Sequence, residues 1–176
     1  MDRLNALFEE LKNIQASRSL PPVDSWEPQR EGAIDIHIDA DGRWHHEGRH
    51  IQRNAIASVF ATILRRDGNQ YFLVTPQEKL RISVEDVPFL GIDAQVQGEG
   101  EELQVIISTN VGDHVLLSSD HPLQMRDEVP YIEVRNQLYA RLTRNTFYFL
   151  VDQGVEENGI WCLYSCGSRF ELGPIA

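Results

Sequence analysis

The sequence predicts an α+β fold of two similar β-rich halves, each running strands, helix, hairpin, with an N-terminal amphipathic helix in front. Two observations point to this class: apolar residues alternate with polar ones in many short segments, and they recur at helical spacing in only a few. Turn-forming pairs that contain glycine separate these segments. We therefore divide the 176 residues into an N-terminal helix and extended arm (1–30), a first half (31–86) and a second half (87–176).

The N-terminal segment predicts a helix followed by an arm. Four apolar residues at positions i, i+3, i+4 and i+7 form one helical stripe: Leu4, Leu7, Phe8 and Leu11. Asp2 is placed to cap this helix. Residues 17–28 contain three prolines, which indicates an extended arm laid over the surface and held there by Trp26.

The first half predicts two hairpins around one helix. Three isoleucines alternate with polar residues, as in a half-buried strand: Ile34, Ile36 and Ile38. Asp41-Gly42 predicts a turn into a partner strand through Trp44. A helix is predicted after Arg53, with the buried stripe Ile56, Val59, Phe60, Ile63 and Leu64. Arg65-Arg66 would close it favourably at the negative end of the helix dipole. Residues 71–75 and 80–84 predict the second hairpin.

The second half repeats this order of elements. Strands are predicted at 89–96, 103–108 and 115–118, then a helix over 136–151 with Leu138, Leu142 and Phe149 on one side. Asn158-Gly159 leads into strands at 160–164 and 169–172. A seam between two related halves is a favoured place for a ligand pocket.

The net charge of the chain limits the classes of partner that we expect it to bind. A net charge of −11 argues against nucleic acid and against an anionic membrane surface, because both are polyanions. Residues 1–15 contain no apolar block typical of a signal peptide, and no run is long enough to span a membrane, so we expect a cytoplasmic protein. Cys162 and Cys166 are too few for a disulfide framework or a four-ligand zinc site and predict reduced thiols.

Several catalytic and metal motifs fail at defined positions. The calcium-loop pattern around Asp39 would need an acid at position 37 and a ring-closing glutamate, where His37 and Gly48 stand. His45 and His46 are neighbours on a predicted strand, so they point to opposite faces and cannot both bind one metal ion. Walker, dinucleotide-binding and Gly-x-Ser-x-Gly motifs are absent. We predict no catalytic residue, no metal and no cofactor.

Basic residues near predicted helix starts indicate an anion site. Fourteen of the 16 basic residues are arginine, which recognises carboxylate and phosphate with a planar fork. Those of interest lie beside the two long predicted helices and on the second hairpin of the first half: Arg53, Lys79, Arg81, Arg135, Arg141 and Arg144. Unpaired N–H groups of a helix start and a nearby arginine together attract anions. The alternative is that these residues pair with the 27 acidic ones.

A series of short motifs in one order resembles a known family. It comprises Pro21-Pro22, Trp26, Ile34-Asp35-Ile36, Asp41-Gly42-x-Trp44, His46-Glu47-Gly48, Leu73-Val74-Thr75-Pro76, Glu78-Lys79, Val84-Glu85-Asp86, Pro88-Phe89, Thr109-Asn110, His121-Pro122-Leu123 and residues 131–135. Together they resemble the bacterial domain-of-unknown-function family 1285 over nearly the whole chain after the opening helix. The chain departs from that family at two places. Gln77 stands where the family usually has an aliphatic residue, and Asn136-Gln137 stands where it usually has small residues.

The resemblance implies a duplicated core whose second half is superficially like a pleckstrin-homology fold, and a nucleotide-like ligand at the seam between the halves, with a role in signalling. It implies no established activity. Carried over by motif, the ligand-binding residues are Glu47, Arg53, Thr75, Glu78, Lys79, Arg81, Asn110, Arg135 and Arg144.

The predicted function is thus a cytoplasmic sensor or signalling module that holds a small phosphate-bearing ligand between its halves. Two alternatives remain. One is an enzyme acting on a nucleotide-like substrate with a divalent ion at Glu47, Glu78 or Glu85. The other is a protein-interaction domain that offers a strand edge or groove to a protein partner.

Overall fold

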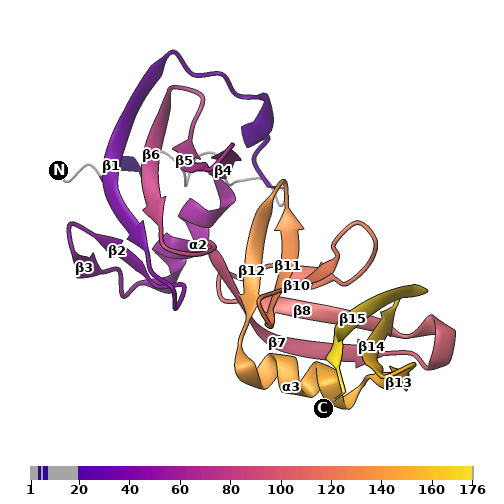
Figure 1. Ribbon diagram of the computed structural model, residues 1–176. Coiled ribbons are helices and arrows are strands. Elements are labelled where there is room, and N and C mark those ends of the chain that lie inside the picture. Colours follow the sequence, from indigo (N-terminus) through magenta and orange to yellow (C-terminus); the bar gives the residue numbers. More distant parts are fainter. Residues whose placement is uncertain (1–3, 5, 8–19, 176) are drawn as a thin grey trace. The chain divides into compact units, whose positions relative to one another are not determined.

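Figure 1 shows a computed structural model of the chain, in which residues 4, 6, 7 and 20–175 are described. The fold divides into unit 1, which ends at Asp86, and unit 2, which begins at Val87. Leu4 and Leu7 are helical and buried, in line with the predicted N-terminal helix. Asp2, Phe8 and Leu11 lie outside the described residues.

An arginine from the sheet of unit 1 holds the arm. The arm contains a short 3-10 helix, η1 (Val23–Ser25). The guanidinium of Arg65 donates hydrogen bonds to the backbone carbonyls of Val23 at 3.1 Å and Trp26 at 2.8 Å. The Trp26 side chain is half-buried, and its carbonyl is one of the two groups that Arg65 holds.

From residue 30 onward, unit 1 is a six-stranded sheet with the helix α2. Its elements are β1 (Arg30–Ile38), β2 (Trp44–His46), β3 (Arg49–His50), α2 (Asn54–Thr62), β4 (Leu64–Asp67), β5 (Gln70–Val74) and β6 (Glu78–Val84). The strand order is β3-β2-β1-β6-β5-β4, with β1 and β6 parallel and the other neighbours antiparallel.

The core of unit 1 forms between the sheet and α2. The alternation predicted for β1 is confirmed, because Ile34, Ile36 and Ile38 are all buried. The Trp44 ring on β2 lies 6.4 Å from the Phe60 ring on α2, centroid to centroid, and both side chains are fully buried. Large aromatic rings in such contact contribute strongly to core stability.

The predicted C-terminal end of this helix is wrong. The helix ends at Thr62, and Leu64, Arg65 and Arg66 belong to β4. The Thr62 hydroxyl donates a hydrogen bond to the Val59 carbonyl at 2.6 Å, and the next residue leaves the helical region. Leu64 instead pairs in register with Leu73 of β5 and is 1% exposed. Strand pairing here outweighs the helical periodicity.

Unit 2 contains a second six-stranded sheet, a helix and a three-stranded sheet. Its elements are β7 (Phe89–Gln97), the 3-10 helix η2 (Gly100–Glu102), β8 (Gln104–Thr109), β9 (His114–Leu116), β10 (Leu123–Arg126), β11 (Val129–Arg135), β12 (Leu138–Leu142), α3 (Arg144–Asp152), β13 (Val155–Glu157), β14 (Ile160–Ser165) and β15 (Ser168–Pro174). The strand orders are β10-β11-β12-β7-β8-β9 and β13-β14-β15.

The helix predicted over 136–151 is half wrong. Residues before Thr143 form the β11–β12 hairpin, and only α3 is helical. Asn136 and Gln137 form its turn, with φ of 44° and 64°, the left-handed pair that a two-residue hairpin requires. Leu138 and Leu142 are four residues apart, which suits a helix stripe, but the same spacing places both on one face of a strand. Strands β10, β11 and β13 were not predicted.

The two six-stranded sheets have the same topology. Numbered from the first strand of each unit, both run 3-2-1-6-5-4, and strands 1 and 6 form a parallel pair at the centre. Each unit also runs strands, helix, hairpin along the chain. The predicted class, an α+β fold of two similar β-rich halves, is therefore confirmed.

Candidate functional site

The nine predicted ligand residues divide between the units. Unit 1 contains Glu47, Arg53, Thr75, Glu78, Lys79 and Arg81, and unit 2 contains Asn110, Arg135 and Arg144. Four of them occupy matching places in the common topology. Glu47 and Asn110 directly follow strand 2, Thr75 directly follows strand 5 of unit 1, and Arg135 is the last residue of strand 5 of unit 2. The convergence of all nine on one ligand stays a prediction.

Thr75 and Asn110 shape the turns that contain them. Thr75 is 1% exposed, and its hydroxyl oxygen accepts the Glu78 amide at 3.1 Å, which closes the β5–β6 turn. The Asn110 side-chain oxygen accepts the Leu90 amide at 3.0 Å, and the Asn110 amide donates to the Leu90 carbonyl at 3.0 Å. Both side chains therefore have a structural role in their turns, which the motifs alone did not reveal.

Arg135 is engaged within unit 2. Its guanidinium lies 2.8 Å from the Asp113 carboxylate and 5.2 Å from the centroid of the Phe89 ring, and its side chain is 16% exposed. Asp113 belongs to the same β8–β9 turn as Asn110, so the structure brings these two predicted residues to one end of the sheet. Here the alternative reading, pairing with an acidic residue, is correct.

Glu47, Arg53 and Arg144 are exposed. Glu47 lies in the β2–β3 turn with φ of 50°. Arg53 is the residue before α2, and Arg144 is the first residue of α3. All three are accessible to a ligand in the unit to which they belong.

Lys79 and Arg81 line one hollow of unit 1, which we call the polar hollow. Its volume is about 530 Å³, and the side chains that matter for its chemistry are Glu31, Asp67, Gln70, Phe72, Lys79 and Arg81. Cross-strand pairing explains the grouping, since Arg81 of β6 pairs with Phe72 of β5 on one side and with Ala33 of β1 on the other. Two of the predicted ligand residues therefore share one concave site.

Lys79 is tied into a charge network, whereas Arg81 is not. The Lys79 ammonium lies 2.7 Å from Asp67, 3.9 Å from Glu31 and 4.1 Å from the centroid of the Phe72 ring. Arg65 adds two hydrogen bonds to Asp67, at 3.1 Å and 2.9 Å. Arg81 is exposed and makes no ion pair or side-chain hydrogen bond within residues 20–175.

Two cations neutralise the main acid of the hollow. Partial burial works to raise the pKa of Asp67, but the hydrogen bonds from Lys79 and Arg65 outweigh it, so this pKa lies below its usual value. Asp67 is thus held ionised and compensated. Among the described residues, the charge of Arg81 is not compensated in this way.

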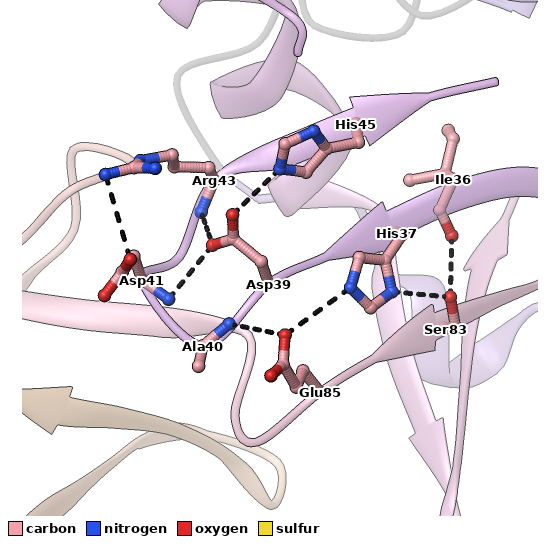
Figure 2. Close-up of polar contacts among 9 residues, drawn as sticks. All are labelled: Ile36, His37, Asp39, Ala40, Asp41, Arg43, His45, Ser83 and Glu85. Carbon is pink, nitrogen blue, oxygen red and sulfur yellow. Dashed lines mark hydrogen bonds and ion pairs between the residues drawn. The ribbon is translucent and has the colours of Figure 1, made fainter. Parts of the chain in front are cut away.

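Figure 2 shows a second polar cluster in unit 1, at the turn between β1 and β2. One Asp39 oxygen accepts the amides of Asp41 at 3.0 Å and Arg43 at 2.9 Å, and the other lies 2.8 Å from the His45 ring nitrogen Nε2. The turn predicted at Asp41-Gly42 is confirmed, with Gly42 at φ 73°. Asp39 therefore organises this turn, a role that sequence reasoning missed.

The same cluster extends to β6 through His37. Its Nδ1 lies 2.9 Å from the Ser83 hydroxyl, and its Nε2 lies 3.6 Å from Glu85, which also accepts the Ala40 amide at 3.1 Å. His37 pairs in register with His45, and His45 with His50, so three histidines lie side by side across β1, β2 and β3. The period-two pattern, applied across paired strands, would have found this row.

Hydrogen bonding also lowers the pKa of Asp39, the acid at the centre of this cluster. Burial works to raise the pKa of Asp39, but the hydrogen bond with His45 and those from the Arg43 and Asp41 amides lower it further than burial raises it. Asp39 is thus held as a carboxylate. Within residues 4, 6, 7 and 20–175, no group of three or more His, Cys, Asp or Glu side chains is arranged to hold a metal ion.

The positions of Glu78 and Glu85 limit where the divalent ion of the alternative function, an enzyme, could bind. Glu78 begins β6 and Glu85 follows its last residue, so the seven-residue strand separates them by roughly 20 Å. One ion cannot contact both. In the part of the chain that is described, no helix is long and apolar enough to cross a membrane.

These features define a protein of two β-rich units with duplicated six-stranded sheets. The chain belongs to the DUF1285 family: residues 21–87 match the model "Domain of unknown function (DUF1285), N-terminal domain", and residues 88–172 match "Protein of unknown function (DUF1285), C-terminal domain".

Two solved structures support this assignment. A DUF1285 family protein from Silicibacter pomeroyi DSS-3 is 35% identical with a TM-score of 0.85, covering 99% of this chain and 97% of that one. A second, from Shewanella baltica OS155, is 29% identical with a TM-score of 0.56, covering 66% of this chain and 90% of that one. No curated protein matches the chain.

Proposed function

We propose that the protein is a non-enzymatic cytoplasmic module that binds a small phosphate-bearing, nucleotide-like ligand, and that the polar hollow of unit 1 holds the phosphate. The observation that carries the proposal is Arg81, an exposed guanidinium on the wall of the hollow with no acidic partner among the described residues. A free planar fork suits two oxygens of one phosphate group.

The surroundings favour a small anion over a large one. Lys79 and Arg65 pair with Asp67, so the charge of this acid is already compensated within the hollow. The chain as a whole carries −11, which repels a polyanion at longer range. A ligand with one or two phosphates gains the local contact and meets little of the distant repulsion.

Ligand-dependent thermal stability tests the proposal. Purified protein is screened against nucleotides, dinucleotides and phosphorylated metabolites. A ligand at about 100 times its dissociation constant adds about 2.7 kcal/mol of stability, which raises the melting temperature by several degrees. Arg81→Ala should remove most of that rise. A well-folded protein that no phosphate-bearing compound stabilises would overturn the proposal.

Arg43→Ala is the matched control. Arg43 is also an exposed arginine of unit 1 and lies outside the polar hollow. Its only ion-pair partner among the described residues is Asp41 at 3.8 Å. This variant changes the net charge equally and should keep the ligand-induced rise. Extending the series to Arg53, Arg135 and Arg144 tests the other predicted arginines.

A protein-interaction domain is the second candidate, favoured by two aromatic residues of α3. Tyr148 is 56% exposed and Phe149 is 40% exposed, and exposed aromatic side chains are enriched at protein interfaces. If the ligand screen is flat, a Tyr148→Ser, Phe149→Ser double variant that loses a partner bound by the parent protein would support this function.

A further inference from the structure

Unit 2 contains a larger hollow, which we call the apolar trough. Its volume is about 790 Å³, within the range of small-molecule sites, and its chemistry rests on Glu101, Leu103, Gln153, Val155, Cys162 and Tyr164. None of these residues belongs to the predicted ligand set or to the polar hollow.

The trough is built on the three-stranded sheet. Val155 of β13 pairs in register with Cys162 of β14, and Tyr164 lies two residues further along the same face. The opposite wall is the η2 segment with Glu101 and Leu103. The Cys166 amide donates to the Leu103 carbonyl at 2.9 Å and fixes this segment to the β14–β15 turn. Both walls are therefore held in place by the backbone.

The floor of the trough is apolar. Val155 is 48% exposed, an unusual state for a valine in a strand, and Leu103 and Cys162 complete the apolar lining. Covering this surface with an apolar group is favourable, at about 25 cal/mol per Å² of area removed from water. The trough thus suits a ligand with an apolar body.

Charges around the trough are almost all negative. Unit 2 carries 13 acidic and only 5 basic residues. Glu101 lines the trough and makes no ion pair within residues 20–175. The one basic residue of the three-stranded sheet, Arg169, is occupied by Glu157 at 2.9 Å and Glu171 at 2.7 Å. The local field therefore attracts a cation and repels a phosphate.

The Tyr164 hydroxyl adds to this preference for a cation, because it favours a ligand that donates a hydrogen bond. Its hydroxyl donates to Glu157 at 2.6 Å, so the single phenolic proton is already used. The Tyr164 oxygen can then only accept a hydrogen bond, and an ammonium group can only donate. Glu101 and Tyr164 are two acceptors on one trough, without a competing donor side chain of positive charge in its lining.

We propose that the apolar trough binds a small, mainly apolar molecule that bears one positively charged amine. The apolar body covers Leu103 and Val155 beside the buried Cys162, and the ammonium group lies toward Glu101 and Tyr164. This site is independent of the polar hollow, because it uses other residues and takes a ligand of opposite charge.

A charge-matched set of probes tests the site in the full chain. The probes are 2-phenylethylamine, neutral 2-phenylethanol and anionic 3-phenylpropionate, which share one apolar body. Backbone amide shifts are followed by NMR during each titration. We expect the amine to bind most tightly and to move the amides of Val155, Cys162 and Tyr164, and the carboxylate to bind most weakly.

The variant Glu101→Gln removes the carboxylate charge of the trough but keeps the size of the side chain. Loss of this carboxylate should weaken the amine about fivefold, as for an exposed ion pair, and leave the neutral alcohol unchanged. Glu128→Gln, which removes an exposed acid of unit 2 outside the trough, is the control and should change neither. Equal affinity for amine and carboxylate, or shifts confined to other residues, would overturn the inference, as would no binding at all.

Discussion

The two units share one sheet topology and differ in where their helix enters. In unit 1, α2 lies between strands 3 and 4 of the sheet, and its Phe60 packs in the core. In unit 2, the link between strands 3 and 4 has no helix, and α3 follows strand 6 and leads into the three-stranded sheet. The sheet order is therefore compatible with a helix at either point, because the parallel central pair needs only four intervening strands.

The units also differ in charge. Unit 1 carries 11 basic and 14 acidic residues, while unit 2 carries 5 and 13, so most of the net negative charge lies in unit 2. The hollow of unit 1 contains the paired charges Lys79 and Asp67 together with Glu31 and an Arg81 that has no acidic partner among the described residues, and the hollow of unit 2 contains Glu101. The two binding proposals thus assign ligands of opposite charge to the two halves of a duplicated framework.

The largest expected effect tests the role of the two helices. Phe60→Ala in α2 should cost about 3–5 kcal/mol of unfolding free energy, because it opens a cavity beside Trp44. Leu150→Ala in α3 should cost about 2–4 kcal/mol, since Leu150 is fully buried as well. Urea unfolding measures both. The exposed Tyr148→Ala is the control, and a Phe60→Ala cost equal to that control would show that α2 is not part of the core.

A smaller loss of unfolding free energy is expected when the Asp39 cluster is changed, and this loss should depend on pH. Since the pKa of Asp39 is lowered in the folded state, its carboxylate stabilises the fold above the unfolded value near 4, and this contribution is lost as the pH falls through the folded value. Asp39→Asn should cost about 1 kcal/mol at pH 7 and less at pH 3, because the amide oxygen still accepts the turn amides but the pairing with His45 is lost. An equal cost at both pH values would contradict this account.

The smallest effect separates two arginines of the same sheet. Arg81→Ala should change stability by less than about 0.5 kcal/mol, because Arg81 has no partner among the described residues. Arg65→Ala should cost more, about 1–3 kcal/mol, since Arg65 bonds to Asp67, Val23 and Trp26. Melting curves of both variants give the comparison. A large loss in Arg81→Ala would mean that this residue is structural rather than available for a ligand.

Much of the fold could be predicted because local patterns and tertiary pairing agree. In β1, the alternation of isoleucines matches the buried face, and Asp41-Gly42 sets the turn that follows. The candidate site was predictable only in part. Lys79 and Arg81 lie two residues apart on a strand and so share a face, which the sequence shows, but their neighbours Asp67 and Glu31 come from other strands.

The sequence by itself determined the class, two β-rich halves with few helices, because period-two alternation and glycine turns are local properties of the chain. Only the tertiary structure decided where ambiguous segments went. Leu138 and Leu142 suit a helix or a strand, and pairing of β12 with β11 and β7 selected the strand. It also decided which arginines have acidic partners: Arg135 pairs with Asp113 of the β8–β9 turn, whereas Arg81 has no such partner among the described residues. A charged side chain's partner depends on contacts far away in sequence, which no local pattern encodes.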